Sequence, residues 1–291
     1  WSQVPAYPGG PLRDEKWKKE TIANTSEQQF QTEFECDFVG SSATLISSSK
    51  LHALSWVKPI TRNDDGLWIY EEPKEDHTYY ITVDTARGQG LDYSAFTVID
   101  ATEMPYRLVA RYKNNIVSPM VYPTVISTVA KQFNNAYVLV EINDIGGQVA
   151  DVLHQDLEYD NILMCSHMGR KGQVVTTGFG GKGTTHMGVR TSAVVKKLGC
   201  SVLKSLIEED KLIVEDLDTV NELTTFIAKK NSYEADDGYN DDLVMSLVLF
   251  AWLTRQDYFK TMTEVDVRTE IYEDEIEKLQ DRLGRMVGGV S

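Results

Sequence analysis

The sequence predicts an α/β fold: a mixed sheet of three antiparallel strands followed by parallel strands, flanked by helices on both faces. Three β-rich runs with short connections, at 79–83, 93–99 and 106–112, are typical of an antiparallel meander. A helical pattern at 118–133 precedes a short and almost wholly apolar run at 136–142. Such a run favours a parallel strand that is buried on both faces.

The remaining elements follow from apolar spacing and from turn residues. Ser118 is expected to cap the 118–133 helix, with Pro119 in its first turn. Asn63-Asp64-Asp65-Gly66 is a turn signal. Further helices are expected at 149–157, 190–209, 217–229 and 242–253, and short strands within 44–56, at 162–165 and at 212–214.

Three regions are expected along the chain. Residues 1–77 form an N-terminal segment that packs on or leads into the core, with irregular structure at 1–13 and an amphipathic helix at 16–38. Residues 78–257 form the core, and 258–291 a charged tail helix. The first residues lack an initiator Met, a basic region and an apolar run. We therefore expect no signal peptide, and the chain reads as a piece of a longer protein.

Composition excludes several classes of protein. No apolar run approaches the roughly 20 residues of a membrane span, so no membrane partner is expected. The three cysteines, Cys36, Cys165 and Cys200, are far apart and form no CxxC or Cys/His cluster. Neither structural zinc nor a disulfide framework is indicated, and a reducing compartment is the simplest setting. The tryptophans Trp17, Trp56, Trp68 and Trp252 are expected to fill the core or lie just above it, which leaves no stacking platform for bases.

Charge is distributed unevenly along this acidic chain. The net charge is −15, yet residues 161–207 contain no Asp or Glu and carry seven Lys and Arg, which leaves −15 − 7 = −22 for the rest. A basic island in an acidic protein is the pattern of a polyanion footprint. The alternative is chance clustering of charge on a solvated face.

Acidic residues occur where a buried sheet should not tolerate them. Asp84 ends an apolar strand, Glu141 lies within another, and Asp241 and Asp242 open an apolar helix. A carboxylate at the edge of a core costs several kcal/mol unless it is paired or binds metal, and no Lys or Arg adjoins these residues in sequence. Alternatively, Asp84 could make an Asx turn and Asp241 or Asp242 an N-cap. Taken together, they favour a site for hard divalent cations.

Four segments are more specific than any short motif. YYITVDTARGQGLDYSAFTVID, AYVLVEINDIGGQVADVLHQDLEYD, LGCSVLKSLIEEDKLIV and GYNDDLVMSLVLFAW resemble the nuclease domain of the large terminase subunit of T-even-type tailed phages. The similarity runs from about residue 40 to residue 256. It implies an RNase H-like fold, the C-terminal nuclease of a headful DNA-packaging motor.

The resemblance also assigns roles to residues. Asp84, Glu141 and Asp242 match the family's catalytic triad, and Asp92 matches a further acidic position near the metals. Asp241 adjoins the triad and competes for that role. Asn240 stands where the family often has His, which puts in doubt a proton-transfer role there but not metal binding. The implied cofactor is Mg²⁺, two ions, with Mn²⁺ as a substitute.

Basic residues are expected to hold DNA. Arg87, in the Gly-rich turn after Asp84, is placed to grip a phosphate. The sequence 178–184 is not a phosphate loop because Gly183, rather than Ser or Thr, follows Lys182. It is expected to be a flexible basic hairpin or loop on the DNA backbone. The other candidates for DNA contact are Arg170, Lys171, Lys182, Arg190, Lys196 and Lys197.

The implied function is metal-dependent cutting of concatemeric viral DNA with little sequence specificity. The implied partners are double-stranded DNA, the terminase ATPase domain, the portal protein and the small terminase subunit, in the host cytoplasm and at the prohead portal vertex. Two alternatives stay open: an RNase H-like junction resolvase, and a non-catalytic module that grips DNA or docks on the portal. The chain has no Walker A motif, so ATP hydrolysis is not expected.

Overall fold

The computed structural model describes Asp14 and residues 16–19, 44–86, 92–166, 173–177, 185–230 and 232–263, with the backbone alone at 173–177. The helices are α3 Ser48–Ala53, α4 Tyr122–Gln132, α5 Gly146–Asp151, the π-helix η1 Val152–Asp156, α6 Ala193–Glu208, α7 Leu217–Thr225 and α8 Asp242–Leu253. Residues 257–263 are also helical. The strands are β1 Thr61–Arg62, β2 Leu67–Ile69, β3 Tyr79–Asp84, β4 Ser94–Asp100, β5 Tyr106–Asn114, β6 Tyr137–Val140, β7 Leu163–Ser166, β8 Gln173–Thr177, β9 Thr185–Met187, β10 Leu212–Ile213, β11 Phe226–Lys229 and β12 Ser232–Ala235.

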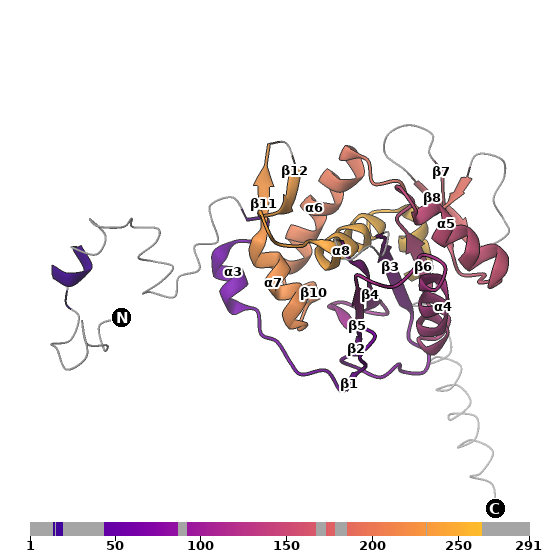
Figure 1. The fold of residues 1–291 in the computed structure, drawn as a ribbon, viewed down its shortest axis with the longest axis horizontal. Coiled ribbons are helices and arrows are strands. Elements are labelled where there is room, and N and C mark those ends of the chain that lie inside the picture. Colours follow the sequence, from indigo (N-terminus) through magenta and orange to yellow (C-terminus); the bar gives the residue numbers. More distant parts are fainter. Residues whose placement is uncertain are drawn as a thin grey trace, which may run out of the picture.

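The expected mixed sheet is confirmed. Its order is β1-β2-β5-β4-β3-β6, with β10 joined to β5. Strands β3, β4 and β5 pair antiparallel, whereas β6 runs parallel to β3 and β10 parallel to β5. Figure 1 shows α6, α7 and the β11–β12 hairpin on one side of the sheet, and α4 and α5 on the other.

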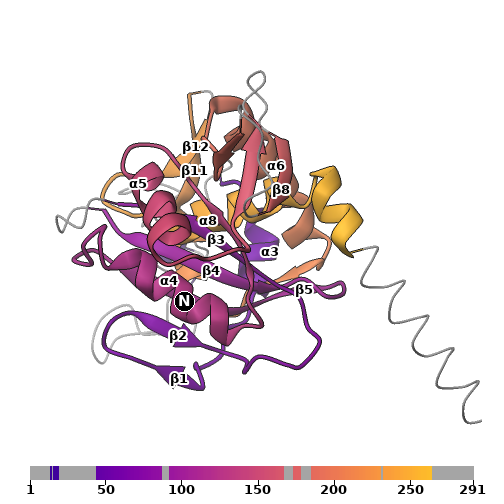
Figure 2. The same ribbon diagram turned by 90° about the vertical axis from the view of Figure 1, so that its right-hand side faces the viewer.

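Alternation along the strands sorts side chains into two cores. On β3, Tyr79, Ile81 and Val83 pack into the cluster that holds α4 and α5, while Tyr80 packs into the cluster that holds α6 and α8. Figure 2 shows α4 and α5 in front of β3 and β4. Successive side chains of a strand point to opposite faces. The even-numbered positions of β3 therefore face α8, and Thr82 Oγ1 donates to the carbonyl oxygen of Ser246 on α8 at 2.8 Å.

Helix α8 lies at the centre of the core cluster that holds α6 and α8. Its residues from Leu243 to Leu253 are all buried, as its unbroken apolar sequence predicts. Helix α6 approaches it closely at Gly199, where an added Cβ would lie 2.4 Å from the backbone oxygen of Val248. The contact between the two helices therefore requires a residue without a side chain at 199.

Two predictions about the N-terminal half were wrong. Residues 44–56 contain helix α3 and no strand of the main sheet, because Ser47 caps the helix by accepting the N–H of Lys50 at 3.4 Å. Helix α4 begins at Tyr122 with Pro123 in its first turn, so Ser118 is not its cap. The backbone carbonyl oxygen of Ser118 instead accepts hydrogen bonds from the N–H groups of Val121 and Tyr122 in a preceding turn, both at 3.0 Å.

Further differences lie in the C-terminal half. The helix expected at 217–229 ends at Thr225, since Phe226–Lys229 pairs with Ser232–Ala235 as a hairpin. Strand β7, expected in the main sheet, pairs antiparallel with β8 and β9 in a separate sheet, and Ile162 just before it forms a parallel bridge to Val138 of β6. The helix expected at 149–157 starts at Gly146 and ends as a π-helix.

Two of the expected core tryptophans have contrasting outcomes. Trp252 is fully buried, whereas Trp56 is 52% exposed.

Among the helices of the described residues, none is both long and apolar enough to cross a bilayer. The predictions for 1–13, for most of 16–38, for the turn at 87–90, for the loop at 178–184 and for the tail at 264–291 lie outside the described residues.

The close approach of α6 and α8 generates a stability prediction. Gly199→Ala would force the helices apart and should lower the free energy of unfolding by about 1–3 kcal/mol, the usual cost of overpacking. Gly147→Ala is the matched control, because an added Cβ there meets nothing within 4 Å. It should leave stability unchanged or raise it by up to about 1 kcal/mol. Urea unfolding measures both, and equal values for the two variants would contradict the packing argument.

Candidate metal centre

Asp84 and Glu141 lie at the same edge and on the same face of the sheet. Asp84 ends β3, and Glu141 directly follows β6, its N–H bonded to the oxygen of Val83 at 2.9 Å. Parallel neighbours end at the same edge, so both carboxyls emerge there. Both also face α8, because Thr82 bonds to that helix and Leu139, two residues before Glu141, packs into its core cluster.

The two carboxyls contact each other. Burial raises the pKa of Asp84 well above its usual range, and the charge and hydrogen bond of Glu141 raise it further. Two carboxyls in contact require a shared proton or a cation between them. Asn143 Nδ2 holds Glu141 by donating to Oε1 at 2.9 Å. Asp84 does not accept from Ala86 as an Asx turn requires, because that N–H donates to Ser94 Oγ at 3.1 Å.

Asp242 brings a third carboxylate from the first turn of α8. Its Oδ2 is buried and accepts no hydrogen bond from the described residues. Burial raises the pKa of Asp242 to about 6, and the charge of Asp241 adds to this, while Lys113 and the N–H groups of Asp242 and Tyr93 oppose it. Asp242 in turn raises the pKa of Asp84, so the two carboxyls are close enough to interact.

Lys113 and Glu222 hold this arrangement, and the sequence analysis did not find them. Glu222 of α7 accepts the N–H groups of Leu243 at 2.8 Å and Val244 at 3.0 Å, which caps α8 from another helix. Its other oxygen accepts from Lys113 Nζ at 2.5 Å. Burial raises the pKa of Glu222 to about 7, although Lys113 opposes the shift. The alternation of side chains along β5 was the available signal, because it puts Lys113 on the face of the sheet that packs against α8.

The two further acidic candidates differ in position. Asp241 precedes α8 without capping it, and its Oδ2 accepts the N–H of Ala235 at 3.1 Å, which fastens the β11–β12 hairpin. Asp92 is exposed and lies two residues before β4, at the edge of the sheet where Asp84 emerges. Neither has the buried, unpaired oxygen that distinguishes Asp242.

The basic candidates divide between described and undescribed residues. Arg190 is exposed and follows Val189, which bridges to Glu141. Lys197 is exposed on α6, and Lys196 is half-buried with its Nζ 5.8 Å from the ring of Phe226. Arg190 therefore lies beside the carboxylates, on the β6 side. The candidates outside the described residues are Arg87, Arg170, Lys171 and Lys182.

One known protein family matches most of this sheet and the helices around it. Residues 81–252, more than half of the chain, match the model of the Terminase RNaseH-like domain family. The chain belongs to this family. It is a terminase domain with an RNase H-like fold, which confirms the broader part of the sequence resemblance. The narrower likeness to T-even-type phages stays a prediction.

Solved structures agree on the fold of this terminase domain. The large terminase nuclease of the thermophilic phage G20c with bound magnesium superposes with a TM-score of 0.55 at 21% identity, over 73% of this chain and 98% of that one. The same G20c nuclease with bound cobalt gives a TM-score of 0.54 at 21% identity, over 73% and 98% of the two chains.

The donor set of the terminase domain fits a hard cation. Asp84, Glu141 and Asp242 offer carboxylate oxygens, the ligands that Mg²⁺ prefers, and one of these oxygens is buried with no hydrogen-bond partner among the described residues. Within the described ranges, no three acidic, His or Cys side chains already enclose a point for an ion. The contact between Asp84 and Glu141 explains this, because a cation would have to part the two carboxyls.

These raised pKa values predict how stability depends on pH. Unfolded carboxyls titrate near pH 4, whereas the folded pKa is about 6 for Asp242 and about 7 for Glu222. The folded state therefore binds more protons between these limits, and stability should fall as pH rises from about 4 to about 7. For Asp242 alone the loss is on the order of 1–3 kcal/mol.

Urea unfolding in EDTA across this pH range tests the prediction. Asp242→Asn should flatten the curve, and excess Mg²⁺ should restore stability at the higher pH, because a cation bound only to the folded state stabilises it. Curves of the wild type and Asp242→Asn that run parallel in EDTA would contradict a raised pKa of Asp242 in the folded protein.

Proposed function

We propose that this terminase nuclease domain is a divalent-metal-dependent DNA endonuclease that cuts concatemeric viral DNA in headful packaging, with little sequence specificity. One observation carries the proposal: carboxyls from β3, from the end of β6 and from α8 converge, and no described residue bonds to the buried Asp242 Oδ2. Such a cluster is unfavourable in a fold unless a cation or substrate chemistry uses it.

Asp84, Glu141 and Asp242 are the proposed metal ligands and catalytic residues, with Asp92 and Asp241 as further candidates. Mg²⁺ is the proposed cofactor, two ions, with Mn²⁺ as a substitute. Bound ions would supply an activated water and stabilise the leaving oxygen of a phosphodiester. The G20c nuclease structures with bound magnesium and cobalt support a divalent metal for this chain as well.

The protein's own groups position these ligands and the DNA. Glu222 and Lys113 fix the first turn of α8 and with it the carboxyl of Asp242. Asn143 orients Glu141. Arg190, Lys196 and Lys197 are proposed to hold DNA phosphates on the β6 side, together with Arg87, Arg170, Lys171 and Lys182. Contacts to phosphates position DNA without reading its sequence, which suits a cutter of low specificity.

Membership of the terminase family supports a role for the domain within a larger motor. The proposed partners are double-stranded DNA, the terminase ATPase domain, the portal protein and the small terminase subunit, and the proposed place of action is the host cytoplasm and the prohead portal vertex. Residues 78–257 are the proposed nuclease core, with 1–77 leading into it and 258–291 as a tail helix. The charge of −22 outside the basic window offers an acidic surface for docking.

The two alternatives are weaker. A junction resolvase shares the acidic cluster, but the chain belongs to the terminase family. A module that only grips DNA has no use for three converging carboxyls with an unpaired oxygen. Gripping of DNA and docking on the portal are compatible with cutting, so they stand as additional roles of the same domain.

Plasmid cleavage by the purified chain tests the proposal. With Mg²⁺ or Mn²⁺ we expect cleavage of DNA of any sequence, abolished by EDTA. Asp84→Asn, Glu141→Gln and Asp242→Asn should each reduce the rate by at least about 10²–10³-fold, because each removes a proposed metal ligand.

Asp237→Asn is the matched control. It neutralises an exposed carboxylate that is no candidate ligand and that pairs with Lys229 of the β11–β12 hairpin at 2.7 Å, and it should stay within about tenfold of the wild type. Metal-independent cleavage would contradict the proposal, as would equal losses for Asp237→Asn and Asp242→Asn. A wild type that binds DNA without cutting it, even with the ATPase domain added back, would favour the gripping module.

A further inference from the structure

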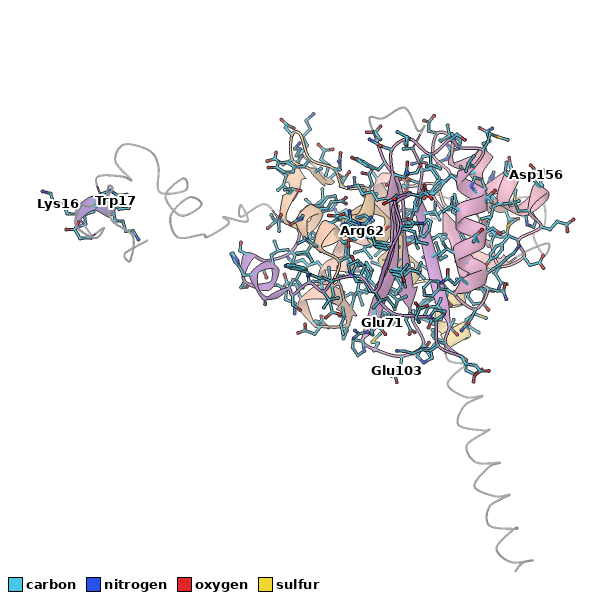
Figure 3. The ribbon with its side chains drawn as sticks, turned by 60° about the horizontal axis from the view of Figure 1, so that its bottom comes forward. Lys16, Trp17, Arg62, Glu71, Glu103 and Asp156 are labelled. Carbon is cyan, nitrogen blue, oxygen red and sulfur yellow. The ribbon has the colours of Figure 1, made fainter. Side chains whose placement is uncertain are left out.

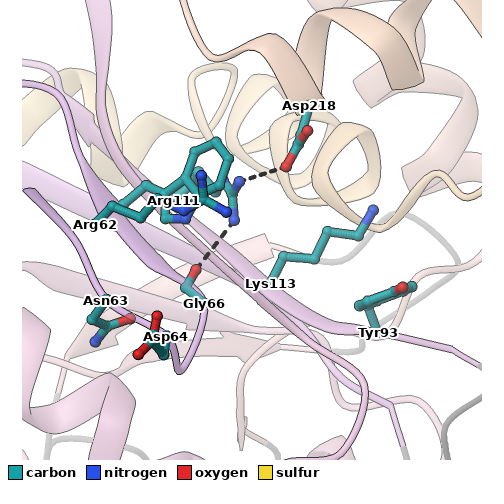
Figure 4. A pocket seen from close by; sticks show the side chains of 9 residues that line it. Arg62, Asn63, Asp64, Gly66, Tyr93, Arg111, Lys113 and Asp218 are labelled. Atoms are coloured by element: carbon teal, nitrogen blue, oxygen red, sulfur yellow. Dashed lines mark hydrogen bonds and ion pairs between the residues drawn. The ribbon is translucent and has the colours of Figure 1, made fainter. Parts of the chain in front are cut away.

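A polar pocket of about 380 Å³ opens beside the metal centre. The turn before β2, residues 63–66, forms one wall, and Trp68, Arg111 and Lys113 form the floor, with Tyr93 and Asp218 at its sides. Figure 4 shows Lys113 extended between Arg111 and Tyr93. Trp68, Arg111 and Lys113 belong to β2 and β5, so the pocket lies on the side of the carboxylates away from β6.

Two residues of the pocket are also neighbours of Asp242. The N–H of Tyr93 and the charge of Lys113 both lower the pKa of that carboxyl. The Nζ of Lys113 lies 4.5 Å from the ring of Tyr93 and 2.5 Å from Glu222. The pocket and the candidate metal centre therefore share Tyr93 and Lys113 as neighbours.

The turn that shapes the pocket is closely fitted to β5. Gly66 has a φ of +104°, and an added Cβ would lie 2.2 Å from the oxygen of Lys113. The oxygen of Gly66 accepts from Lys113 N at 3.2 Å and from Arg111 Nη1 at 3.1 Å. A glycine is needed at this close approach, and it sets the turn firmly against the floor.

Arg111 is part of the floor and is already neutralised. It is buried, its Nη2 bonds to Asp218 at 2.5 Å, and its Nε lies 3.4 Å from Asp216. Its guanidinium also lies 3.6 Å from the centre of the Trp68 ring. The charge of Arg111 is therefore neutralised by Asp218 and Asp216. Its guanidinium holds the wall of the pocket in place and is not available to bind a ligand.

Arg62 is the cation at the mouth that is left for a ligand. It is exposed, its guanidinium lies 4.3 Å from the centre of the Trp68 ring, and it forms no ion pair with another described residue. A guanidinium stacked on a ring keeps its edge N–H groups for a bidentate contact with phosphate. Figure 3 shows Arg62 well apart from Asp156, the last residue of η1.

DNA at the carboxylates must continue in both directions from the phosphate that is cut. Arg190 and Lys197 lie on the β6 and α6 side, whereas Arg62 and Lys113 lie on the β2 and β5 side. We propose that this pocket holds the phosphodiester backbone of the DNA on the β2 side of the metal centre, with Arg62 as its phosphate contact. The inference rests on the proposed function and adds a second arm to the DNA track.

The charges around the mouth indicate a positioning contact of modest strength. The cations are Arg62, Arg111 and Lys113, and the acids are Asp64 and Asp218. Because Asp218 pairs with Arg111 and Lys113 with Glu222, the mouth offers a local donor and no broad positive field. Loss of Arg62 should therefore weaken binding by about 3–10-fold and should act alike on all sequences.

The test measures binding of a fluorescent duplex in Ca²⁺ and cleavage in Mg²⁺, with the wild type and three variants. Arg62→Ala should weaken binding and raise KM more than it lowers kcat. The slope of log affinity against log salt should shrink by about 0.9, the value for one lost phosphate contact. Arg62→Lys keeps a cation at the mouth and should restore most of the slope.

Arg255→Ala is the matched control. Arg255 is an exposed arginine just beyond the C-terminal end of α8, about 20 Å along the helix from Asp242. It should bind and cut like the wild type. If the wild type cuts and Arg62→Ala matches Arg255→Ala in affinity and salt slope, the pocket proposal is overturned while the nuclease proposal stands. A wild type that does not cut counts against the nuclease proposal, and the binding measurements then still decide whether Arg62 contacts DNA.

Discussion

The contact between the carboxyls of Asp84 and Glu141, with Asp242 close by, is the constraint on which the rest of the structure depends. Like charges at the edge of a core are unfavourable, and burial raises the cost of ionising them. The fold therefore needs enough apolar packing elsewhere to keep them together. The two clusters on the faces of the sheet supply it, above all through α8, whose residues from Leu243 to Leu253 are all buried.

The same helix explains how the third carboxyl is positioned. An apolar helix that opens with two aspartates needs its first N–H groups satisfied, and Asp241 makes no cap bond. Glu222 supplies the cap from α7, and Lys113 on β5 binds the other oxygen of Glu222. One chain of contacts thus ties the end of the sheet to the start of α8, so that stability and site geometry depend on the same residues.

Much of this could be predicted from the sequence because local pattern carried the information. The three antiparallel strands, the buried strand before Glu141 and the apolar helix after Asp241 follow from periodicity and were confirmed. The elements that were missed depend either on a single local hydrogen bond or on pairing with a later segment of the chain. A single cap at Ser47 turned an expected strand into α3, and pairing with 232–235 turned the end of an expected helix into β11.

The partners of the site were out of reach for the same reason. Lys113 and Glu222 are 109 residues apart in sequence and have no local motif. Spacing along the chain gives the face of β5 on which Lys113 lies, but their meeting also depends on the packing of α7, which spacing does not encode. The pocket at Arg62 depends likewise on β1 and β2, strands of two and three residues that carry almost no periodic signal.

The central claim is that the three carboxyls hold divalent cations. The most direct measurement is a crystal structure of the chain soaked in Mn²⁺, with anomalous scattering to locate the metal. The account predicts metal between the parted carboxyls of Asp84 and Glu141, with Asp242 Oδ2 as a ligand. Metal bound elsewhere, or a soaked crystal in which Asp84 and Glu141 stay in contact with no metal beside Asp242, would contradict it.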